Sequence, residues 1–214
     1  MEITLLDVND SPPRFDEALY EAEIAENADI GTVVTTLTAS DADADSVITY
    51  SITGTNSKFS IDNSGKIFNS LMYVVCCTFL TYVVLYLGQV TVSARLDREE
   101  TDRYSIDISA YDGTYPSSTT LVLAVTDIND EKPRFLRDLY SLTVSERALV
   151  GDPIGAVTAV DDDLGDGGIV RYSILPSWST DLFSIDQESG LIKLNGKLDF
   201  ESVPNIFSDV VCHT

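Results

Sequence analysis

Basic residues and histidine are scarce in this chain, and their scarcity limits what the protein can do. Lysine and arginine total 13 against 35 aspartates and glutamates, which gives a formal net charge of −22. Nucleic acid and anionic membrane surfaces repel a chain of this charge. The single histidine, His213, is the penultimate residue, whereas a Ser-His-Asp or Cys-His catalytic group needs a histidine held by folded surroundings. We therefore expect that the protein is not an enzyme.

Cysteines are also few and do not form a recognisable pattern. Cys76 and Cys77 are adjacent, and Cys212 is the third residue from the end. This spacing predicts neither a disulfide framework nor a zinc site. The chain begins Met-Glu-Ile-Thr, without the basic and apolar regions of a signal peptide. We read the sequence as a fragment of a longer protein, and the fragment itself contains neither a signal peptide nor a convincing membrane anchor.

An acidic phrase occurs twice, 120 residues apart, as DVNDSPPRF at 7–15 and DINDEKPRF at 127–135. Each copy places carboxylates and a carboxamide on an extended stretch that ends at proline. Calcium takes six to eight oxygen ligands in proteins, so this phrase has the chemistry of a calcium site. Repetition at a domain-sized period indicates like modules with the phrase at each junction.

The residues that follow each phrase also match one another. The matched pairs are 18–27 with 138–147, 31–43 with 151–163, 48–52 with 170–174, 59–62 with 183–186, and 96–100 with 198–202. The first pair predicts an alternating strand in both copies, with Glu26 and Glu146 near its end. Short alternating runs separated by Gly, Asn and Asp turns predict an all-β fold of tandem Greek-key β-sandwiches.

These motifs together resemble the cadherin family. The features that carry the resemblance are the DxND linker, a glutamate in the first strand, DxD, LDRE and AxD, in that order and mostly twice. The resemblance implies the end of a preceding repeat and linker at 1–14, a cadherin repeat at 15–130, and a partial, truncated repeat at 131–214. It also implies calcium as the bound ion.

The resemblance assigns calcium ligands to two junctions. At the second junction the ligands would be Glu26, Asp97, Glu99, Asp127, Asn129, Asp130, Asp161 and Asp163, with the carbonyls of Ile128, Glu131 and Gly167. At the first junction they would be Asp7, Asn9, Asp10, Asp41, Asp43 and Asp112. Neither set is complete as the family builds it. The first lacks an upstream repeat, and the second lacks the AxD aspartate of the second repeat.

Charge supports this reading of the second junction. Its seven carboxylates would repel one another at short range, and the three calcium ions usual for the family would nearly cancel them. Isolated DxD segments are more often turn formers without a metal. The segment 41–46 imitates the start of an EF-hand loop, but Ser46 stands where that loop needs glycine. The acidic residues are therefore interpreted as a junction site.

An apolar run, Leu71–Leu87, has no counterpart in the second copy. No charged residue occurs from Ile67 to Ala94. Gly65 precedes Asp97 by 32 residues, whereas Gly190 precedes Asp199 by 9, so the excess is 23 residues. We interpret residues 66–88 as a foreign insert.

The favoured origin of the insert is a translated intron, because its ends can be encoded with GT and AG boundaries and a pyrimidine tract translates into such residues. A long apolar loop would expose a patch that promotes aggregation. A membrane span is the third reading, since 17 apolar residues lie at the lower limit for a helix. A span here would divide one sandwich between neighbouring strands.

The function implied is calcium-dependent adhesion between cells, by a fragment of an extended cadherin ectodomain that calcium makes rigid. Its partners would be other cadherins, homophilic or heterophilic, on the same or an opposing cell. Its place would be the extracellular part of a plasma-membrane protein. An alternative is a calcium-stabilised matrix- or carbohydrate-binding β-sandwich module. A metal-assisted hydrolase would need an open coordination position and a base within reach.

Overall fold

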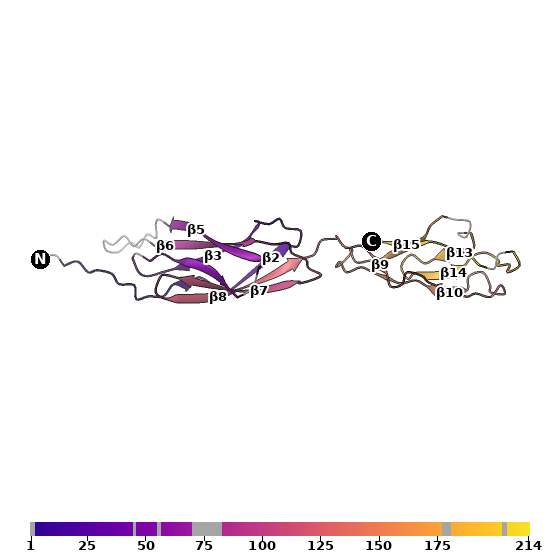
Figure 1. Cartoon of the computed structure of the whole chain (residues 1–214), viewed down its shortest axis with the longest axis horizontal. Helices are drawn as coiled ribbons and strands as arrows, with labels where there is room; N and C mark the ends of the chain where they lie inside the picture. Colours follow the sequence, from indigo (N-terminus) through magenta and orange to yellow (C-terminus); the bar gives the residue numbers. More distant parts are fainter. Residues whose placement is uncertain (1–2, 45, 55–56, 70–82, 177–180, 203–204) are drawn as a thin grey trace, which may run out of the picture. The chain divides into compact units, whose positions relative to one another are not determined.

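The computed structural model of the chain describes residues 3–44, 46–54, 57–69, 83–176, 181–202 and 205–214. They belong to two compact units, Met1–Asp127 and Ile128–Thr214, called unit 1 and unit 2 below (Figure 1). The regular elements of the described residues are β-strands, without an α-helix, so the all-β prediction is confirmed. In the described part of the chain, no helix has the length and apolar character needed to cross a membrane.

Unit 1 consists of two four-stranded sheets. The first has the order β1-β3-β6-β5, formed by Arg14–Phe15, Val33–Ser40, Val83–Val92 and Phe59–Asn69. The second has the order β2-β8-β7-β4, formed by Leu19–Ala25, Pro116–Thr126, Arg103–Tyr111 and Thr49–Thr53. β1 to β4 alternate between the two sheets, whereas β5–β6 and β7–β8 are hairpins within one sheet each, and the two sheets form a sandwich.

The core of unit 1 lies between the two sheets because each strand alternates buried and exposed side chains. In β8, Leu121, Leu123 and Val125 are buried and alternate with half-buried residues. They belong to the same apolar cluster as Leu37 of β3 and Val90 of β6, in the other sheet. Period-two alternation places every second side chain on one face of a strand, so two such faces close on each other.

Strand directions fix the two ends of unit 1. β2 pairs with β8 in parallel over seven positions, and every other pair in this unit is antiparallel. Glu26 and Asp127 follow the ends of β2 and β8, so they lie at the same end of the unit. β7 runs antiparallel to β8, so Asp112, which follows β7, lies at the opposite end.

Unit 2 repeats this plan with shorter strands. β9 (Arg134–Phe135) pairs with β11 (Ala159–Val160). β14 (Leu191–Leu194) pairs with both β10 (Pro153–Ala156) and β13 (Phe183–Ile185). β12 (Arg171–Ile174) pairs with β15 (Val210–His213). Phe135 pairs with Ala159 as Phe15 pairs with Ala39 in unit 1. The two copies of the predicted internal repeat therefore pair equivalent residues in equivalent strands.

One predicted strand is absent. Residues 138–147 were expected to match β2, but they contain no strand in unit 2. In unit 1, β2 is an edge strand whose hydrogen bonds go to β8. The described residues of unit 2 include no counterpart of β8, so the alternating segment has nothing to pair with. Leu139 and Leu142 consequently remain exposed.

The described ends of the proposed insert, residues 66–69 and 83–88, extend a hairpin in unit 1. β5 and β6 pair through Gly65 with Leu87 as far as Asn69 with Val83, and β6 pairs with β3 from Val33 to Ser40. Residues 70–82, the centre of the proposed insert, lie outside the described residues. In unit 2 the pairing of β10 with β14 corresponds to that of β3 with β6, and it stops at Leu191.

Gly88 occupies the position of Gly190 in unit 2. A Cβ at Gly88 would lie 2.9 Å from the ring of Tyr50, and a Cβ at Gly190 would lie 3.3 Å from the ring of Tyr172. Each tyrosine hydroxyl accepts a 2.8 Å hydrogen bond from a backbone N–H, that of Ala39 or Ala159. The glycine leaves room for the ring that makes this bond.

The C-terminal tail forms a strand where the repeat needs one. β15 pairs with β12 as β7 pairs with β4, so Cys212 and His213 correspond to Ala110 and Tyr111. The next position, Thr214, therefore corresponds to Asp112. The tail reaches the place of the AxD aspartate, and a threonine stands there.

Candidate metal centres

Three aspartates gather at one end of unit 1, in a group called the N-terminal cluster below: Asp41, Asp43 and Asp112. One carboxylate oxygen from each lies within 4.8 Å of the others. Asp41 and Asp43 follow β3, and Asp112 follows β7. The backbone N–H of Asp43 donates to Asp41 Oδ1 at 2.9 Å, a turn that holds both carboxylates on one side.

The linker at the start of unit 1 reaches the N-terminal cluster. Ser11 N–H donates to Asp43 Oδ2 at 3.0 Å, and Asp7 accepts a 2.6 Å hydrogen bond from Ala44 N–H. Asn9 is half-buried beside them, and Asp10 is exposed, with one 3.4 Å contact to the Ser11 hydroxyl. The structure therefore brings the predicted first-junction residues to one region of unit 1.

Buried oxygens of the N-terminal cluster lack hydrogen-bond donors. Asp112 is 7% exposed, and its Oδ1 accepts from the N–H groups of Thr114 and Tyr115, both at 2.6 Å. Its Oδ2 accepts no hydrogen bond from the described residues, and the same holds for Asp41 Oδ2 and Asn9 Oδ1. Buried acceptors without donors are costly, and a cation is the natural partner for them.

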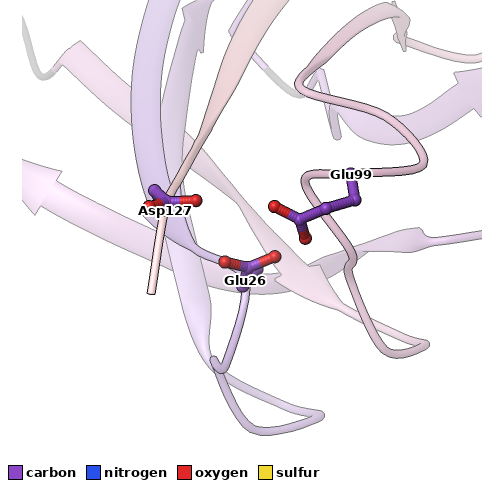
Figure 2. Close-up of side chains that lie close together, drawn as sticks. All are labelled: Glu26, Glu99 and Asp127. Atoms are coloured by element: carbon purple, nitrogen blue, oxygen red, sulfur yellow. The ribbon is translucent and has the colours of Figure 1, made fainter. Parts of the chain in front are cut away.

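A second acidic group lies at the opposite end of unit 1, and it is called the C-terminal cluster below: Glu26, Glu99 and Asp127 (Figure 2). Their carboxylate oxygens also approach within 4.8 Å of one another, and Glu26 is only 5% exposed. Glu26 Oε2 accepts a 2.7 Å hydrogen bond from the backbone N–H of Arg98. This bond ties the end of β2 to the LDRE loop.

Arg98 brings a positive charge that the sequence analysis did not assign to the site. Its guanidinium forms ion pairs with Glu99 and Asp127. Burial opposes its charge, but these bonds and the charge of Glu26 raise the pKa of Arg98. Burial and the neighbouring Glu26 raise the pKa of Glu99. The LDRE motif was visible in the sequence, but spacing alone does not indicate where its arginine points.

Asp97 does not join the C-terminal cluster in this structure. It is exposed, and its Oδ1 accepts a 2.9 Å hydrogen bond from Glu100 N–H. The carboxylate thus caps the first backbone turn of the loop. A metal ligand at this position would need a different side-chain direction.

Unit 2 repeats the acidic turn of the N-terminal cluster. Asp163 N–H donates to Asp161 Oδ1 at 3.0 Å, and Glu131 N–H donates to Asp163 Oδ1 at 3.4 Å. A Cβ at Gly167 would lie 2.9 Å from Asn129 Nδ2 and 3.3 Å from Asp163 Cβ. Asp161 Oδ2 is buried and accepts no hydrogen bond within the described residues. Asn129 and Gly167 therefore lie beside the Asp161–Asp163 turn.

The other predicted ligands of the linker are less constrained. Asp130 is exposed and makes no hydrogen bond among the residues that the structure describes, and Ile128 begins unit 2. At the AxD position, Thr214 offers a neutral hydroxyl instead of a carboxylate. The acidic turn of unit 2 thus has two aspartates where the turn of unit 1 has three.

Unit 2 repeats one hydrogen bond of the C-terminal cluster at its LDFE sequence. Glu146 Oε2 accepts a 3.2 Å hydrogen bond from Phe200 N–H, as Glu26 accepts from Arg98 N–H in unit 1. Asp199 and Glu201 flank Phe200, as Asp97 and Glu99 flank Arg98. The sequence comparison aligned these residues but did not assign them to a site.

The donor set of these clusters suits a hard divalent cation. The ligand atoms are carboxylate and amide oxygens, without the thiolate or imidazole groups that zinc prefers. Carboxylates this close repel one another unless a cation or protons compensate. The buried oxygens of Asn9, Asp41 and Asp112 have no donor among the described residues, and this is the specific observation that favours an ion over a plain turn.

The fold and these clusters define a class of protein, that of tandem β-sandwich repeats with acidic linkers. The sequence matches the Cadherin domain family over residues 20–126 and 140–208. This match includes most of the chain, and the chain belongs to the cadherin family.

Relatives of known identity agree with this assignment. Human Protocadherin Fat 4 is 31% identical over 204 residues, which are 94% of this chain and 4% of that protein. The mouse Cadherin EGF LAG seven-pass G-type receptor 1 is 33% identical over 207 residues, 94% of this chain and 6% of that protein. The chain thus spans a small part of the length of these curated relatives.

Solved structures show the same fold. A crystal structure of mouse Cadherin-23 EC22-24 has a TM-score of 0.76 at 28% identity and includes 92% of this chain and 57% of that one. The cis-dimer structure of Protocadherin gammaB7 EC3-6 has a TM-score of 0.75 at 29% identity, with 92% and 44% included. The predicted family and the predicted β-sandwich repeats are confirmed.

Proposed function

We propose that this chain binds calcium at its acidic linkers and acts as part of a calcium-dependent adhesion ectodomain. The ligands in unit 1 would be the N-terminal cluster with Asp7, Asn9 and Asp10, and the C-terminal cluster with Asp97. The linker and the acidic turn of unit 2 would add Asn129, Asp130, Asp161 and Asp163, with the carbonyls of Ile128, Glu131 and Gly167. When bound, calcium would supply positive charge to oxygens that otherwise repel one another.

The observation that carries the proposal is the buried Asp112 carboxylate. One of its oxygens accepts from two backbone N–H groups, while the other is buried without a donor among the described residues, and the carboxylate lies near those of Asp41 and Asp43. A turn-forming aspartate needs only the first oxygen. The second oxygen is explained by a cation.

Adhesion follows from the family rather than from a site in these units. The relatives are adhesion proteins by family, and a chain of such repeats transmits contact between cells only if its linkers are stiff. We propose that calcium supplies that stiffness, that the chain is extracellular, and that its partners are other cadherins on the same or an opposing cell. We expect no enzymatic activity from it.

The experiment compares the parent chain with Asp112→Asn by calorimetric calcium titration and thermal unfolding. Asparagine keeps the oxygen that accepts from Thr114 and Tyr115 but replaces the oxygen that lacks a donor. We expect the variant to bind fewer calcium ions and to show a smaller calcium-induced rise in Tm. A ligand at a hundred times its Kd stabilises the folded state by about 2.7 kcal/mol. In chelator, the Tm of the Asp112→Asn variant should equal or exceed that of the parent chain, because the substitution removes a buried negative charge.

Asp107→Asn is the matched control. Asp107 lies on β7, the strand that Asp112 follows; it is exposed, and its carboxylate accepts a hydrogen bond from the Thr120 hydroxyl, away from both clusters. Its substitution should leave calcium stoichiometry unchanged. If the parent itself binds no calcium and has the same Tm in calcium and in chelator, the proposed function is wrong.

A further inference from the structure

The single Asn-Gly pair of the chain occupies a turn of unit 2. Asn195 and Gly196 follow β14 and begin the connection to the LDFE loop at 198–201. Their backbone N–H groups both donate to the carbonyl of Leu182, at 2.7 and 3.3 Å. Asn195 is exposed, so water has access to its side chain.

The hydrogen bonds of this turn do not require an Asn-Gly pair. Unit 1 has the same turn at Ser93 and Ala94, whose N–H groups donate to the carbonyl of Lys58 at 2.7 and 3.4 Å. The φ angle of Gly196 is not positive, so no left-handed backbone calls for glycine at this position. A Cβ at Gly196 would lie 2.7 Å from Leu182 Cδ2, the flexible end of a side chain. The amide chemistry of the pair is therefore particular to unit 2.

The side-chain amide of Asn195 is activated by its neighbour on β13. Ser184 Oγ donates a 3.0 Å hydrogen bond to Asn195 Oδ1. This bond polarises the amide carbon and stabilises the negative oxygen that forms when a nucleophile adds to it. The adjacent nucleophile is the backbone nitrogen of Gly196, which has no Cβ beside it. Its hydrogen bond to Leu182 is the longer of the two in the turn and the easier to open.

We propose that Asn195 is a self-modification site, at which the chain converts its own asparagine into isoaspartate and aspartate. The nitrogen of Gly196 loses its proton and bonds to Asn195 Cγ. The bond from Cγ to Nδ2 breaks, and ammonia leaves with that proton. Water then opens the resulting five-membered imide at either carbonyl, which gives aspartate or isoaspartate. No oxidant, metal or partner takes part, so the inference is independent of the calcium proposal.

The modification changes both the charge and the backbone of the turn. Either product adds one negative charge to a chain whose formal net charge is −22. Isoaspartate also carries the main chain through its side-chain carbons, so the two N–H groups no longer share the Leu182 carbonyl. The LDFE loop follows directly, and the hydrogen bond from Phe200 N–H to Glu146 holds it. Isoaspartate at this position therefore loosens the start of the loop irreversibly.

Ageing of the intact purified chain at physiological temperature and pH tests the site. Peptide mapping by mass spectrometry, with chromatographic separation of the two products, follows the conversion at Asn195. Asn27 is the internal control, because it is also exposed but is followed by Ala28, whose N–H donates at 3.0 Å to Ala25. We expect conversion at Asn195 to be several-fold faster, with isoaspartate among the products. Equal rates at both sites would overturn the proposal. Aspartate without isoaspartate would also overturn it, because that result indicates direct hydrolysis.

Two substitutions of Ser184 test its activating hydrogen bond. Ser184→Ala should slow the conversion about fivefold, the effect of one hydrogen bond to the reacting carbonyl. Ser184→Thr keeps the hydroxyl and should restore most of the rate. The Tm of each variant shows whether the substitution alters the fold instead. If the alanine variant has the Tm of the parent and converts as fast, Ser184 takes no part in the modification.

Hydrogen exchange measures the structural consequence. In the aged chain the amides of residues 195–200 should exchange faster than in fresh chain, whereas those of 93–98 in unit 1 should not change. Freshly prepared Asn195→Asp carries the added charge without the altered backbone, so it should exchange as the parent does. Unchanged exchange in a chain rich in isoaspartate would show that the turn accommodates the modification, and the proposed loosening would be wrong.

Discussion

At the scale of single residues, Tyr50 links the two sheets of unit 1. Its ring packs on Gly88 of β6 and lies 6.0 Å from the ring of Phe15, and its hydroxyl accepts from Ala39 N–H in β3. Burial raises the pKa of Tyr50, with a smaller opposing effect of the Ala39 hydrogen bond. Tyr172 makes the same bond in unit 2, so the tyrosine is part of the repeat's structure.

Tyr50→Phe tests this role. The substitution leaves the ring but removes the acceptor of a buried backbone N–H, which costs about 1–3 kcal/mol of folding free energy. We expect the unfolding of unit 1, followed by urea denaturation, to shift accordingly. Tyr104→Phe is the control, because the Tyr104 ring packs on Phe59 and its hydroxyl makes no hydrogen bond within the described residues. A loss of equal size in both variants would contradict the role of the Tyr50 hydroxyl.

The sequence was sufficient for the residues whose positions follow from short spacing. Asp41 and Asp43, and likewise Asp161 and Asp163, were expected to act together because the members of each pair lie only two positions apart in the chain. Arg98 was not predicted, because a long side chain can point into the loop or into solvent at equal spacing. Thr214 was not predicted either, since only the pairing of β15 with β12 shows which residue takes the place of Asp112.

At the scale of elements, the same alternating pattern gave a strand in one unit and none in the other. Residues 19–25 became β2 because β8 lies beside them, and residues 139–145 have no such neighbour among the described residues. Alternation predicts which face a segment can bury, but a strand exists only when another strand accepts its hydrogen bonds. The sequence pattern therefore predicted which side chains this segment could bury as a strand, but not whether the strand forms.

The described ends of the proposed insert extend the β5–β6 hairpin, so its effect on the stability of unit 1 can be tested by deletion. Deletion of residues 66–88 joins Gly65 to Gln89, and a glycine still stands against Tyr50. We expect unit 1 to fold with equal or greater stability, because unit 2 is built without the added pairs. Thermal unfolding of the deletion variant measures this. A variant that fails to fold would show that the segment belongs to the repeat.

The origin of the insert is a separate question that proteins cannot answer. The intron interpretation stays a prediction, and sequencing of transcripts across codons 60 to 100 would test it. Transcripts that mostly retain the segment would contradict it, and the hairpin would then be a feature of the expressed repeat.

At the scale of the whole molecule, the link between the units is a short acidic stretch. Asp127 closes the C-terminal cluster of unit 1, and Asn129 lies beside the acidic turn of unit 2. Asp130, the next residue in the chain, is exposed and makes no hydrogen bond among the described residues. We propose that calcium uses this residue, since the fold itself does not.

Asp130→Ala tests the coupling of the units. The substitution should leave the Tm in chelator unchanged, because no described contact is lost, and should remove most of the calcium-induced rise. Scanning calorimetry of both forms measures the two effects. Asp138→Ala, another exposed aspartate of unit 2, should keep the full rise. An undiminished rise in Asp130→Ala would remove this residue from the ligand set.

The parallel pairing of β2 with β8 also determines how unit 1 meets a pulling force. The chain enters β2 at Leu19 and leaves β8 at Thr126, and these strands run side by side in one direction. A force that pulls the start of β2 away from the end of β8 therefore slides the two strands past each other along their length. All seven paired positions then carry the load together in shear, instead of opening one after another as a zipper would.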